Sequence, residues 1–224
     1  MSGLIVYHGS TQIVNPPVYH GGSSHNDYGY GFYCTEDISK AKEWACQNNS
    51  DGYANRYSFS ADGLNVVDLN GSGYSILNWL AVLAKHRSYW ERSAISEQAK
   101  RYLQENFYPD LSSADVIRGY RADDSYFAFA RTFVSNGITV EQLTRAMQLG
   151  NLGEQVVLVS RRSFEQIEWD SAETADCATY FLLAKQREQE ASRAYRKIVR
   201  EEPIMNGLFM ADIIRRGLKN EDFL

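Results

Sequence analysis

Two short motifs near the start of the chain place a histidine, glycines and aromatic residues at spacings that suit ligand binding. His8 and Gly9 follow a short apolar run, and Tyr33 follows a second group of glycines. Trp44 comes eleven residues after Tyr33, inside a segment with helical periodicity. A strand-end histidine can hydrogen-bond a ligand, and aromatic faces can stack on a planar group. The alternative is that Tyr33 and Trp44 are core aromatics and that His8 is a satisfied strand-end histidine.

Other kinds of site find little support in the sequence. The histidines lack partners at the spacing of metal ligands, so we expect no metal site. The three cysteines show no Cys-x-x-Cys spacing, which disfavours a disulfide framework or a thiolate zinc site and fits a reducing cytoplasm. No Gly-x-x-x-x-Gly-Lys-Ser/Thr or Gly-x-Ser-x-Gly motif occurs. The sequence therefore points to the two motifs as the part of the chain that carries chemistry.

Composition and charge narrow the class of protein further. The chain has 224 residues, 44% hydrophobic and 23% charged, which is typical of a globular domain. No apolar run approaches about 18 residues, and the start carries no basic and apolar leader, so neither a membrane span nor a signal peptide is expected. The net charge of −5 argues against a protein that coats nucleic acid. Residues 185–219 carry a net charge of +4, which predicts either a basic helical face docked on an acidic body or a partner surface.

The elements that must position these residues are both strands and helices. Strands are expected over residues 4–8, 32–34, 54–59, 64–69, 115–117, 154–160 and 167–169. Helices are expected over residues 37–48, 74–89, 93–107, 173–200 and 208–218, with shorter ones around 126–133 and after a capping box at Thr139. Thr35 is the expected cap of the first helix, and Asp62-Gly63 predicts a turn that pairs two strands.

This order of elements predicts an α+β fold in a single domain, residues 1–224. A helical insertion is expected over about residues 74–110, and C-terminal helices over about residues 173–218. Residues 9–29 are rich in glycine, serine, asparagine and proline and predict a long loop between the two motifs. Long loops inside compact domains are usually functional, so this loop is expected beside the site.

Taken together, the two motifs resemble the NAD-binding half of ADP-ribosyltransferases of the histidine–tyrosine–glutamate class, which includes diphtheria toxin and the poly-ADP-ribose polymerases. In that class a strand ends in Tyr-His-Gly, and a Gly-x-Gly-x-Tyr segment precedes a helix with a second aromatic residue. His8, Gly9, Tyr33 and Trp44 occupy those positions here. Over about residues 1–217 the chain also resembles a family of uncharacterised bacterial proteins of the same clan, which share Tyr-His-Gly-Ser and a glutamine before a late strand. The resemblance implies a split β-sheet core.

The resemblance implies NAD as the substrate and a role for each motif residue. Nicotinamide is a planar cation in NAD, and it is expected between Tyr33 and Trp44 with its amide on the Gly9 backbone. His8 is expected to donate a hydrogen bond to a ribose hydroxyl. For Arg121, a contact with the NAD diphosphate competes with a structural bond to a nearby carboxylate. The predicted NAD-binding residues are His8, Gly9, Ser10, Gly31, Tyr33, Trp44 and Arg121.

The third motif departs from the class at its catalytic carboxylate. In the class a glutamate directly precedes the apolar run of a late strand, and in this chain that register falls on Gln155, with Glu154 one residue earlier. Adjacent strand residues face opposite sides, so without a bulge only one of the two lies in the cleft. We predict Gln155 there, which makes His8, Tyr33 and Gln155 the catalytic residues. A glutamine keeps a hydrogen bond to the ribose but lacks the charge that stabilises a ribosyl cation.

The resemblance predicts a mono-ADP-ribosyltransferase that moves ADP-ribose from NAD to a macromolecular acceptor, with a protein favoured over a nucleic acid. An NAD glycohydrolase and a catalytically inactive module that binds NAD or ADP-ribose are the alternatives. Proteins of this kind resemble bacterial toxins or toxin–antitoxin components, so the resemblance also allows a small antitoxin-like partner. The expected setting is the cytoplasm, with no membrane contact.

Overall fold

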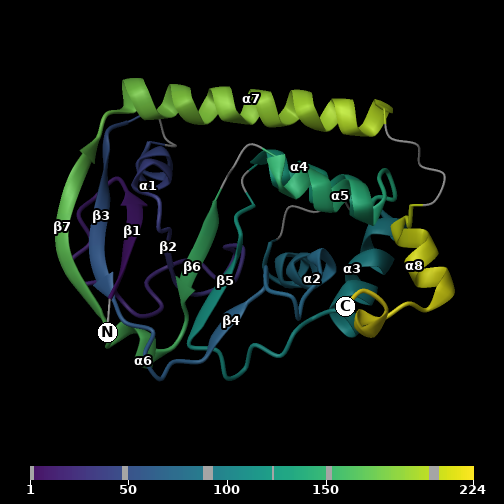
Figure 1. Ribbon diagram of the computed structural model, residues 1–224, viewed down its shortest axis with the longest axis horizontal. Helices are drawn as coiled ribbons and strands as arrows, with labels where there is room; N and C mark the ends of the chain where they lie inside the picture. Colours follow the sequence, from purple (N-terminus) through teal and green to yellow (C-terminus); the bar gives the residue numbers. More distant parts are fainter. Residues whose placement is uncertain (1–2, 47–49, 88–92, 123, 150–152, 202–206) are drawn as a thin grey trace.

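The structure, a computed structural model, describes residues 3–46, 50–87, 93–122, 124–149, 153–201 and 207–224. Two β-sheets lie side by side, most of the helices gather at one end, and one long helix runs along the length of the molecule (Figure 1). The fold is α+β, as the sequence predicts.

The two sheets are formed by segments that interleave along the chain. The first sheet contains β1 (Leu4–Ser10), β3 (Gly52–Phe59) and β7 (Ile167–Ala175), which pair antiparallel in that order. The second contains, in spatial order, β2 (Phe32–Cys34), β6 (Glu154–Leu158), β5 (Val116–Tyr120) and β4 (Val66–Asp68). Only β4 and β5 are parallel in the second sheet. Among the described residues the two sheets are joined by one bridge, between Tyr7 and Thr35.

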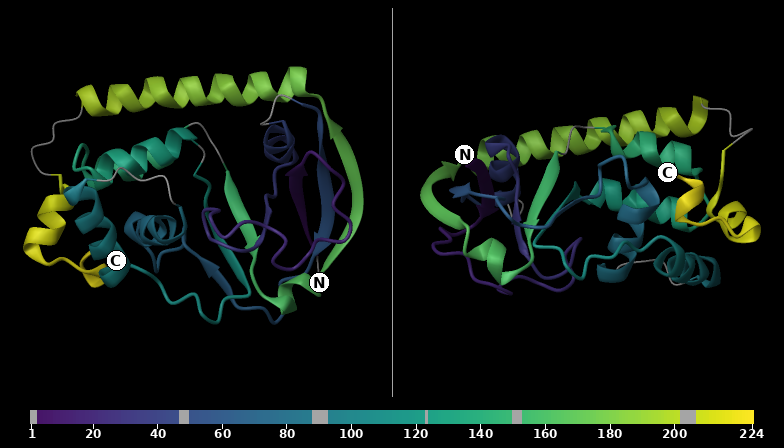
Figure 2. Two further views of the ribbon diagram at one scale, coloured as in Figure 1. Left: turned by 180° about the vertical axis from the view of Figure 1, so that it is seen from behind. Right: turned by 60° about the horizontal axis from the view of Figure 1, so that its bottom comes forward.

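The helices cover one end and one side of this pair of sheets. They are α1 Ile38–Ala45, α2 Ile76–His86, α3 Ala94–Asn106, α4 Asp124–Val134, α5 Val140–Met147, α6 Arg161–Phe164, α7 Cys177–Glu201 and α8 Met210–Arg216. A 3-10 turn over Asn220–Asp222 follows α8. Both views in Figure 2 show α7 along one side of the molecule, with α2–α5 on the side of the second sheet and α8 beyond them at the far end, where it packs on α3. The insertion expected over residues 74–110 corresponds to α2 and α3.

Two apolar clusters hold the sheets in position. The larger one joins α2–α5 to the second sheet and includes the fully buried Trp79 and Phe133. The smaller one lies between the sheets and contains Val6 of β1, Phe32 of β2 and Leu158 of β6. Burying a large apolar side chain stabilises a fold by about 1.5–3 kcal/mol. The smaller cluster therefore fixes β1 against β2 and brings the two N-terminal motifs together.

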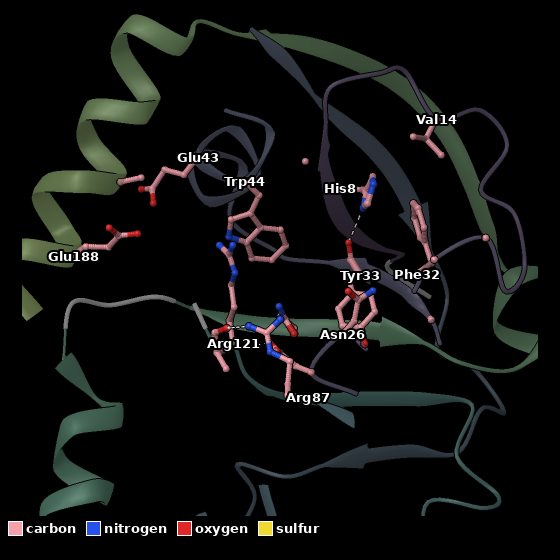
Figure 3. Close-up of a pocket in the computed structure, with 18 of the residues that line it drawn as sticks. His8, Val14, Asn26, Phe32, Tyr33, Glu43, Trp44, Arg87, Arg121 and Glu188 are labelled. Carbon is pink, nitrogen blue, oxygen red and sulfur yellow. Dashed lines mark hydrogen bonds and ion pairs between the residues drawn. The ribbon is translucent and has the colours of Figure 1, made fainter. Parts of the chain in front are cut away.

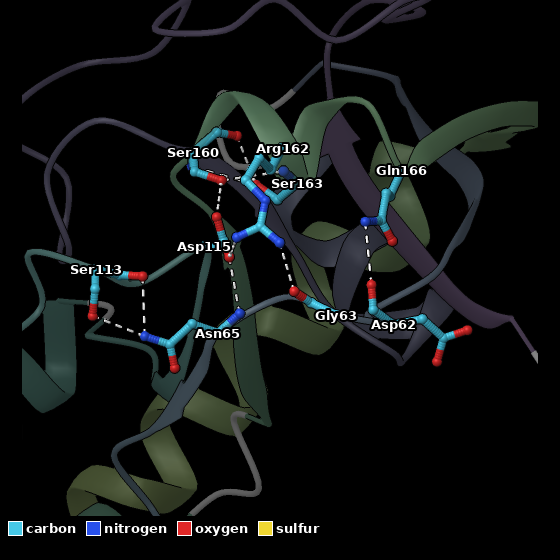
Figure 4. Close-up of polar contacts among 9 residues, drawn as sticks. All are labelled: Asp62, Gly63, Asn65, Ser113, Asp115, Ser160, Arg162, Ser163 and Gln166. Carbon is cyan, nitrogen blue, oxygen red and sulfur yellow. Dashed lines mark hydrogen bonds and ion pairs between the residues drawn. The ribbon is translucent and has the colours of Figure 1, made fainter.

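A buried carboxylate ties β5 and β6 to the segment before β4 (Figure 4). Asp115 accepts hydrogen bonds from the Ser160 hydroxyl at 2.5 Å, from the Asn65 backbone N–H at 2.9 Å and from the Arg162 guanidinium at 3.0 Å. These partners hold the pKa of Asp115 below its ordinary value, with the Ser160 hydrogen bond as the main cause. The cluster fixes the end of β6 and thereby the register of the strand that begins with Glu154 and Gln155.

The pairing predicted for residues 54–59 and 64–69 is wrong. Gly63 does form a turn, with φ at +72°, and Leu64 N–H donates to the carbonyl oxygen of Ala61. The two strands then separate, because β3 lies between β1 and β7 whereas β4 pairs in parallel with β5. The segment between them crosses from one sheet to the other. A turn signal sets the local direction of the chain, and the partners of each strand come from distant residues.

Several predicted boundaries also shift. Asp37, not Thr35, caps α1, since its side chain accepts from the backbone N–H groups of residues 39 and 40. The capping box at Thr139 and Gln142 is confirmed. β1 runs on through Ser10, and β7 extends to Ala175, so α7 begins later than expected. The predicted helix ends at residues 48 and 89 lie outside the described residues.

Candidate functional site

A cavity of about 790 Å³ lies between the two sheets and beneath α7 (Figure 3). β1, β2, β6, α1 and the loop over residues 11–31 form most of its walls. All but one of the predicted site residues line it, namely His8, Gly9, Gly31, Tyr33, Trp44, Arg121 and Gln155. Ser10 does not, because it lies at the end of β1, where its hydroxyl accepts from the Gln12 backbone N–H. Segments that are far apart in the sequence therefore converge on one hollow.

His8 is held by a hydrogen bond that fixes its tautomer. Its Nδ1 lies 2.8 Å from the carbonyl oxygen of Tyr33, which can only accept, so Nδ1 carries the proton. Burial lowers the pKa of His8, and the ring is therefore neutral near pH 7. In that state Nε2 has a free lone pair and accepts hydrogen bonds. The sequence resemblance predicts that His8 donates a hydrogen bond to a ribose hydroxyl. The structure instead leaves His8 Nε2 able only to accept one from such a hydroxyl.

Gly9 is required by the close approach of β1 to α1. A Cβ atom at this position would overlap the carbonyl oxygen of Ala41 and lie 2.9 Å from the backbone nitrogen of Ala45. The backbone groups of Tyr7 bond to Thr35 on the side of β1 that faces away from β3. Because N–H and C=O groups alternate between the two sides of a strand, those of Gly9 point to the same side as those of Tyr7. The backbone of Gly9 thus faces the cavity side of β1.

The Tyr33 hydroxyl fastens the preceding loop. It donates to the carbonyl oxygen of Gly29 at 2.7 Å and accepts from the backbone N–H of Tyr28 at 3.0 Å. Gly29 has φ at +78°, and a Cβ there would come within 2.7 Å of the His86 ring, so only glycine suits the position. Burial raises the pKa of Tyr33 far above neutrality. Its hydroxyl is therefore a neutral structural group, and its ring is what it offers to the cavity.

Trp44 lies on α1 opposite Tyr33. In Figure 3 its ring appears between the guanidinium of Arg121 and the pair formed by His8 and Tyr33. The carbon Cζ of Arg121 is 4.6 Å from the centre of the Trp44 ring, within the range of a cation–π contact. The indole nitrogen is buried, and no described residue bonds to it. Trp44 thus has one face on a cation and a polar atom without a protein partner, which is unusual for a residue that only fills a core.

The two adjacent residues at the start of β6 face opposite sides, as strand alternation predicts. Gln155 is 5% exposed and lines the cavity, and its amide oxygen finds no hydrogen-bond partner among the described residues. Glu154 is exposed on the other side, where it accepts from the Asn70 amide at 2.8 Å and lies 3.6 Å from Arg118. The side chain that faces His8 and Tyr33 across the cavity is therefore the glutamine.

A second arginine, which the sequence did not suggest, lines the same cavity. Arg87 donates to the carbonyl oxygen of Ala122 at 3.1 Å and lies 3.3 Å from the carboxylate of Asp27. Asp27 is buried and also accepts from the backbone N–H of Ala122. This network brings Arg87 close to Arg121, as Figure 3 shows. Asp27 belongs to the glycine-rich motif and was within reach of sequence analysis, whereas nothing in the local sequence marks Arg87.

α7 supplies the wall opposite the N-terminal motifs, through Phe181, Lys185, Arg187 and Glu188. Arg187 holds the carboxylate of Glu43 on α1 with two nitrogens, at 2.6 and 3.0 Å. The side chains of this pair are only 11% and 8% exposed. Both nitrogens contact one carboxylate oxygen in a close, charge-assisted pair, so this contact sets the position of α7 over the cavity. The sequence predicted a basic helix against an acidic body but not this contact.

The part of the chain that the structure describes contains no group of three or more histidine, cysteine, aspartate or glutamate side chains placed to hold a metal ion. None of its helices has both the length and the apolar character that crossing a bilayer requires. Cys34, Cys46 and Cys177 are buried, and none of the three forms a disulfide.

The chain belongs to the DUF3990 family, which is described as a family of unknown function, and the match covers residues 4–169. No curated protein and no solved structure matches the chain. The motif residues of β1, β2, α1 and β6 all lie inside the family region. The wall formed by α7 lies outside it.

Proposed function

We propose that this protein is a mono-ADP-ribosyltransferase, which moves ADP-ribose from NAD to a macromolecular acceptor. The observation that carries the proposal is the convergence of His8, Gly9, Tyr33, Trp44 and Gln155 on one cavity. Those residues come from four elements, and the sequence resemblance assigned each of them to the same site. A cavity of about 790 Å³ is within the size range of small-molecule sites, which favours a ligand as large as a dinucleotide.

The chemistry of the cavity suits both ends of NAD. The nicotinamide ring would lie between Tyr33 and Trp44, where stacking and cation–π attraction contribute about 0.5–2 kcal/mol. Its carboxamide would bond to the N–H and C=O of Gly9, and His8 Nε2 would accept from a ribose hydroxyl. Arg87 and Arg121 would bind the diphosphate, because guanidinium groups pair well with phosphate oxygens.

The reaction breaks the bond between nicotinamide and ribose. Nicotinamide leaves as a neutral molecule with the bonding electrons, and a ribosyl cation develops on the sugar. A nucleophile of the acceptor then bonds to that carbon and releases its proton, so NAD and acceptor give ADP-ribosyl acceptor, nicotinamide and a proton. The Gln155 amide oxygen, which has no protein partner among the described residues, would accept from the ribose hydroxyl and direct its dipole at the cation.

Gln155 also supports two competing functions. A neutral amide stabilises the cation less than a carboxylate does, so turnover is slower than in enzymes with a glutamate. Water in place of the acceptor would make the protein an NAD glycohydrolase, and no turnover would make it a module that binds NAD or ADP-ribose. The resemblance to toxins favours a bacterial toxin or toxin–antitoxin component that acts in the cytoplasm, with a protein as the acceptor.

Incubation with radiolabelled NAD and a cell lysate separates these functions. Label on macromolecules supports transfer, free ADP-ribose supports hydrolysis, and binding without either product supports the inactive module. Treating the labelled material with protease and with nuclease identifies the class of acceptor. A protein that neither binds nor consumes NAD would contradict the proposal as a whole.

A matched pair of substitutions tests the role of Gln155. Gln155→Glu adds a negative charge beside the developing cation, and one such electrostatic contact is worth about 3–4 kcal/mol, or about 100- to 1000-fold in rate. NAD hydrolysis should therefore accelerate in this variant. The control is Glu154→Gln, which should change the rate little because Glu154 points away from the cavity. Loss of activity in Glu154→Gln together with no change in Gln155→Glu would assign the carboxylate role to Glu154.

A further inference from the structure

The long helix α7 has two sides of different character. Its inner side packs on the protein, where Ala191 is buried, Tyr195 stacks on Phe129 at 4.1 Å and Arg187 binds Glu43. Its outer side faces away from the other described elements, as Figures 1 and 2 show. Residues on that outer side are exposed over five helical turns, from Leu182 to Arg200.

The C-terminal half of the outer side carries four cations. Arg193, Arg196, Lys197 and Arg200 follow the spacing i, i+3, i+4, i+7, so they share one face of the helix. They enclose a hollow of about 270 Å³ that no acidic side chain lines among the described residues. The three arginines form no ion pair with any described residue. Like charges at these spacings destabilise a helix, so the arrangement has a cost that an anionic partner would remove.

The N-terminal half of the same side begins with two exposed leucines. Leu182 is 65% exposed and Leu183 is 47% exposed. Leu182 and Arg200 are separated by 18 residues, or five full turns, so they lie on one line along the helix. The exposed residues between Leu183 and Arg193 are Lys185, Gln186, Gln189 and Glu190; Lys185 pairs with Glu188, and Glu190 accepts from the Gln186 amide. The outer side thus begins with two leucines, continues with polar and locally paired side chains, and ends with the four cations.

We propose that this outer side of α7 is the docking surface for a protein partner that presents an acidic segment next to apolar side chains. The inference is independent of the NAD chemistry proposed above. The acidic segment would pair with the four cations, and the apolar side chains would cover Leu182 and Leu183. Electrostatic complementarity of this kind mainly governs orientation and association rate, while buried apolar contacts supply affinity.

The observations favour a protein over the other anionic partners. The basic stripe is about 10 Å long, so it reaches only about two phosphates of a nucleic-acid strand. The rest of the chain is acidic and would repel a polyanion or an anionic membrane. A phosphate backbone offers no contact to two leucines placed in line with the stripe. A second copy of this chain that docked symmetrically through the same face would bring its own four cations against these four.

Site-specific photo-crosslinking in the cells that produce the protein tests the proposal. A benzophenone amino acid is placed at Gln189, between the two halves of the surface, and at Arg101 on α3 as the control position, which is also exposed. We expect a polypeptide adduct from position 189 only. Mass spectrometry of the adduct should locate the crosslink in a segment with acidic residues on one side of the attachment point and apolar residues on the other.

That segment, made as a synthetic peptide, then serves as the probe for affinity measurements on the purified chain. Arg193→Glu combined with Arg196→Glu should weaken binding about tenfold or more, and Leu182→Ser should weaken it as well. Arg101→Glu, a charge reversal of the same kind on α3, should leave it unchanged. A nuclease-sensitive adduct, a lipid adduct, an adduct to a second copy of the chain, no adduct at 189, or peptide binding that ignores the Arg193/Arg196 reversal would each overturn the proposal.

Discussion

The two walls of the cavity are built from different kinds of contact. The wall on β1, β2 and α1 offers aromatic faces and open backbone groups from His8, Gly9, Tyr33 and Trp44. The wall on α7 offers charged side chains, and one of them, Arg187, already holds Glu43. The first wall lies within the family region and the second lies outside it. The first wall is therefore the proposed recognition surface, called the recognition wall below. The α7 wall covers the cavity, and its charged side chains form ion pairs with other protein side chains.

The largest expected effect comes from breaking the anchor of the α7 wall. Arg187→Met removes the closer of the two cations that pair with the buried Glu43, since Lys40 at 3.4 Å remains, and breaking a buried ion pair costs up to about 3–5 kcal/mol. Urea denaturation should show that loss in the free energy of unfolding. Lys185→Met is the control, because its pair with Glu188 is partly exposed and contributes about 1 kcal/mol or less. Equal, small losses in both variants would mean that α7 is not held by Arg187.

On the recognition wall, the strongest effect is expected at Gly9. Gly9→Ala drives a methyl group into the carbonyl oxygen of Ala41, and overpacking of this kind costs about 1–3 kcal/mol of stability. The displaced strand should also lose NAD binding, measured by calorimetry. Gly73→Ala provides the matched control, since a Cβ at Gly73 meets no atom within 4 Å. Intact NAD affinity in a folded Gly9→Ala protein would remove the backbone of Gly9 from the site.

Trp44→Ala sharpens the comparison by removing one aromatic face. We expect NAD affinity to fall by about 1–3 kcal/mol, or about 5- to 150-fold, because stacking and burial are both lost. Isothermal titration calorimetry measures the change directly. Unchanged affinity in the folded variant would assign Trp44 to packing beneath Arg121 instead of ligand recognition.

The smallest expected effect is the pH dependence of His8. Burial lowers its pKa below 6.5, so the folded chain resists protonation that the unfolded chain accepts. The contribution of His8 to stability is therefore complete above about pH 6.5 and is lost as the pH falls below it. NAD affinity of the folded protein should hold from pH 8 to below 6.5 and decline only as the pH falls through the lowered pKa of His8, where Nε2 gains a proton and can no longer accept. His8→Asn should flatten that profile, and an equally steep decline in the variant would assign it to another group.

Local signals predicted the recognition wall well. The strand over residues 32–34 follows from turn residues around an apolar run. Strand alternation predicts that only one of Glu154 and Gln155 lies in the cavity, and the register of the family resemblance favours Gln155, which the structure places there. The structure also brings the two N-terminal motifs together, as their spacing suggested. The N-terminal motifs lie within about 45 residues of one another, and the direction of a strand side chain depends on that strand alone. Both can therefore be predicted without knowing the rest of the fold.

The α7 wall could not be predicted in the same way. Arg187 and Glu43 look like ordinary surface charges in the sequence, and their contact spans 144 positions. Only the docking of α7 decides which of its polar residues face the cavity. The predicted pairing of residues 54–59 with 64–69 failed for a similar reason, since strands far away in the sequence compete successfully for the same edges.

The bridge between the sheets, Tyr7 with Thr35, bears on how the protein would bind the proposed substrate. An antiparallel continuation of that bridge would place Tyr33 opposite Gly9, but Tyr33 belongs to β2 and pairs with Val157 of β6 instead. A carboxamide carries one carbonyl and one N–H edge, the same pair of groups that a peptide unit presents. Bound at Gly9 in the proposed complex, nicotinamide would take the place of the next residue of an antiparallel partner. The protein would then bind the carboxamide edge of its substrate as it binds its own backbone, and those two hydrogen bonds would need no side chain.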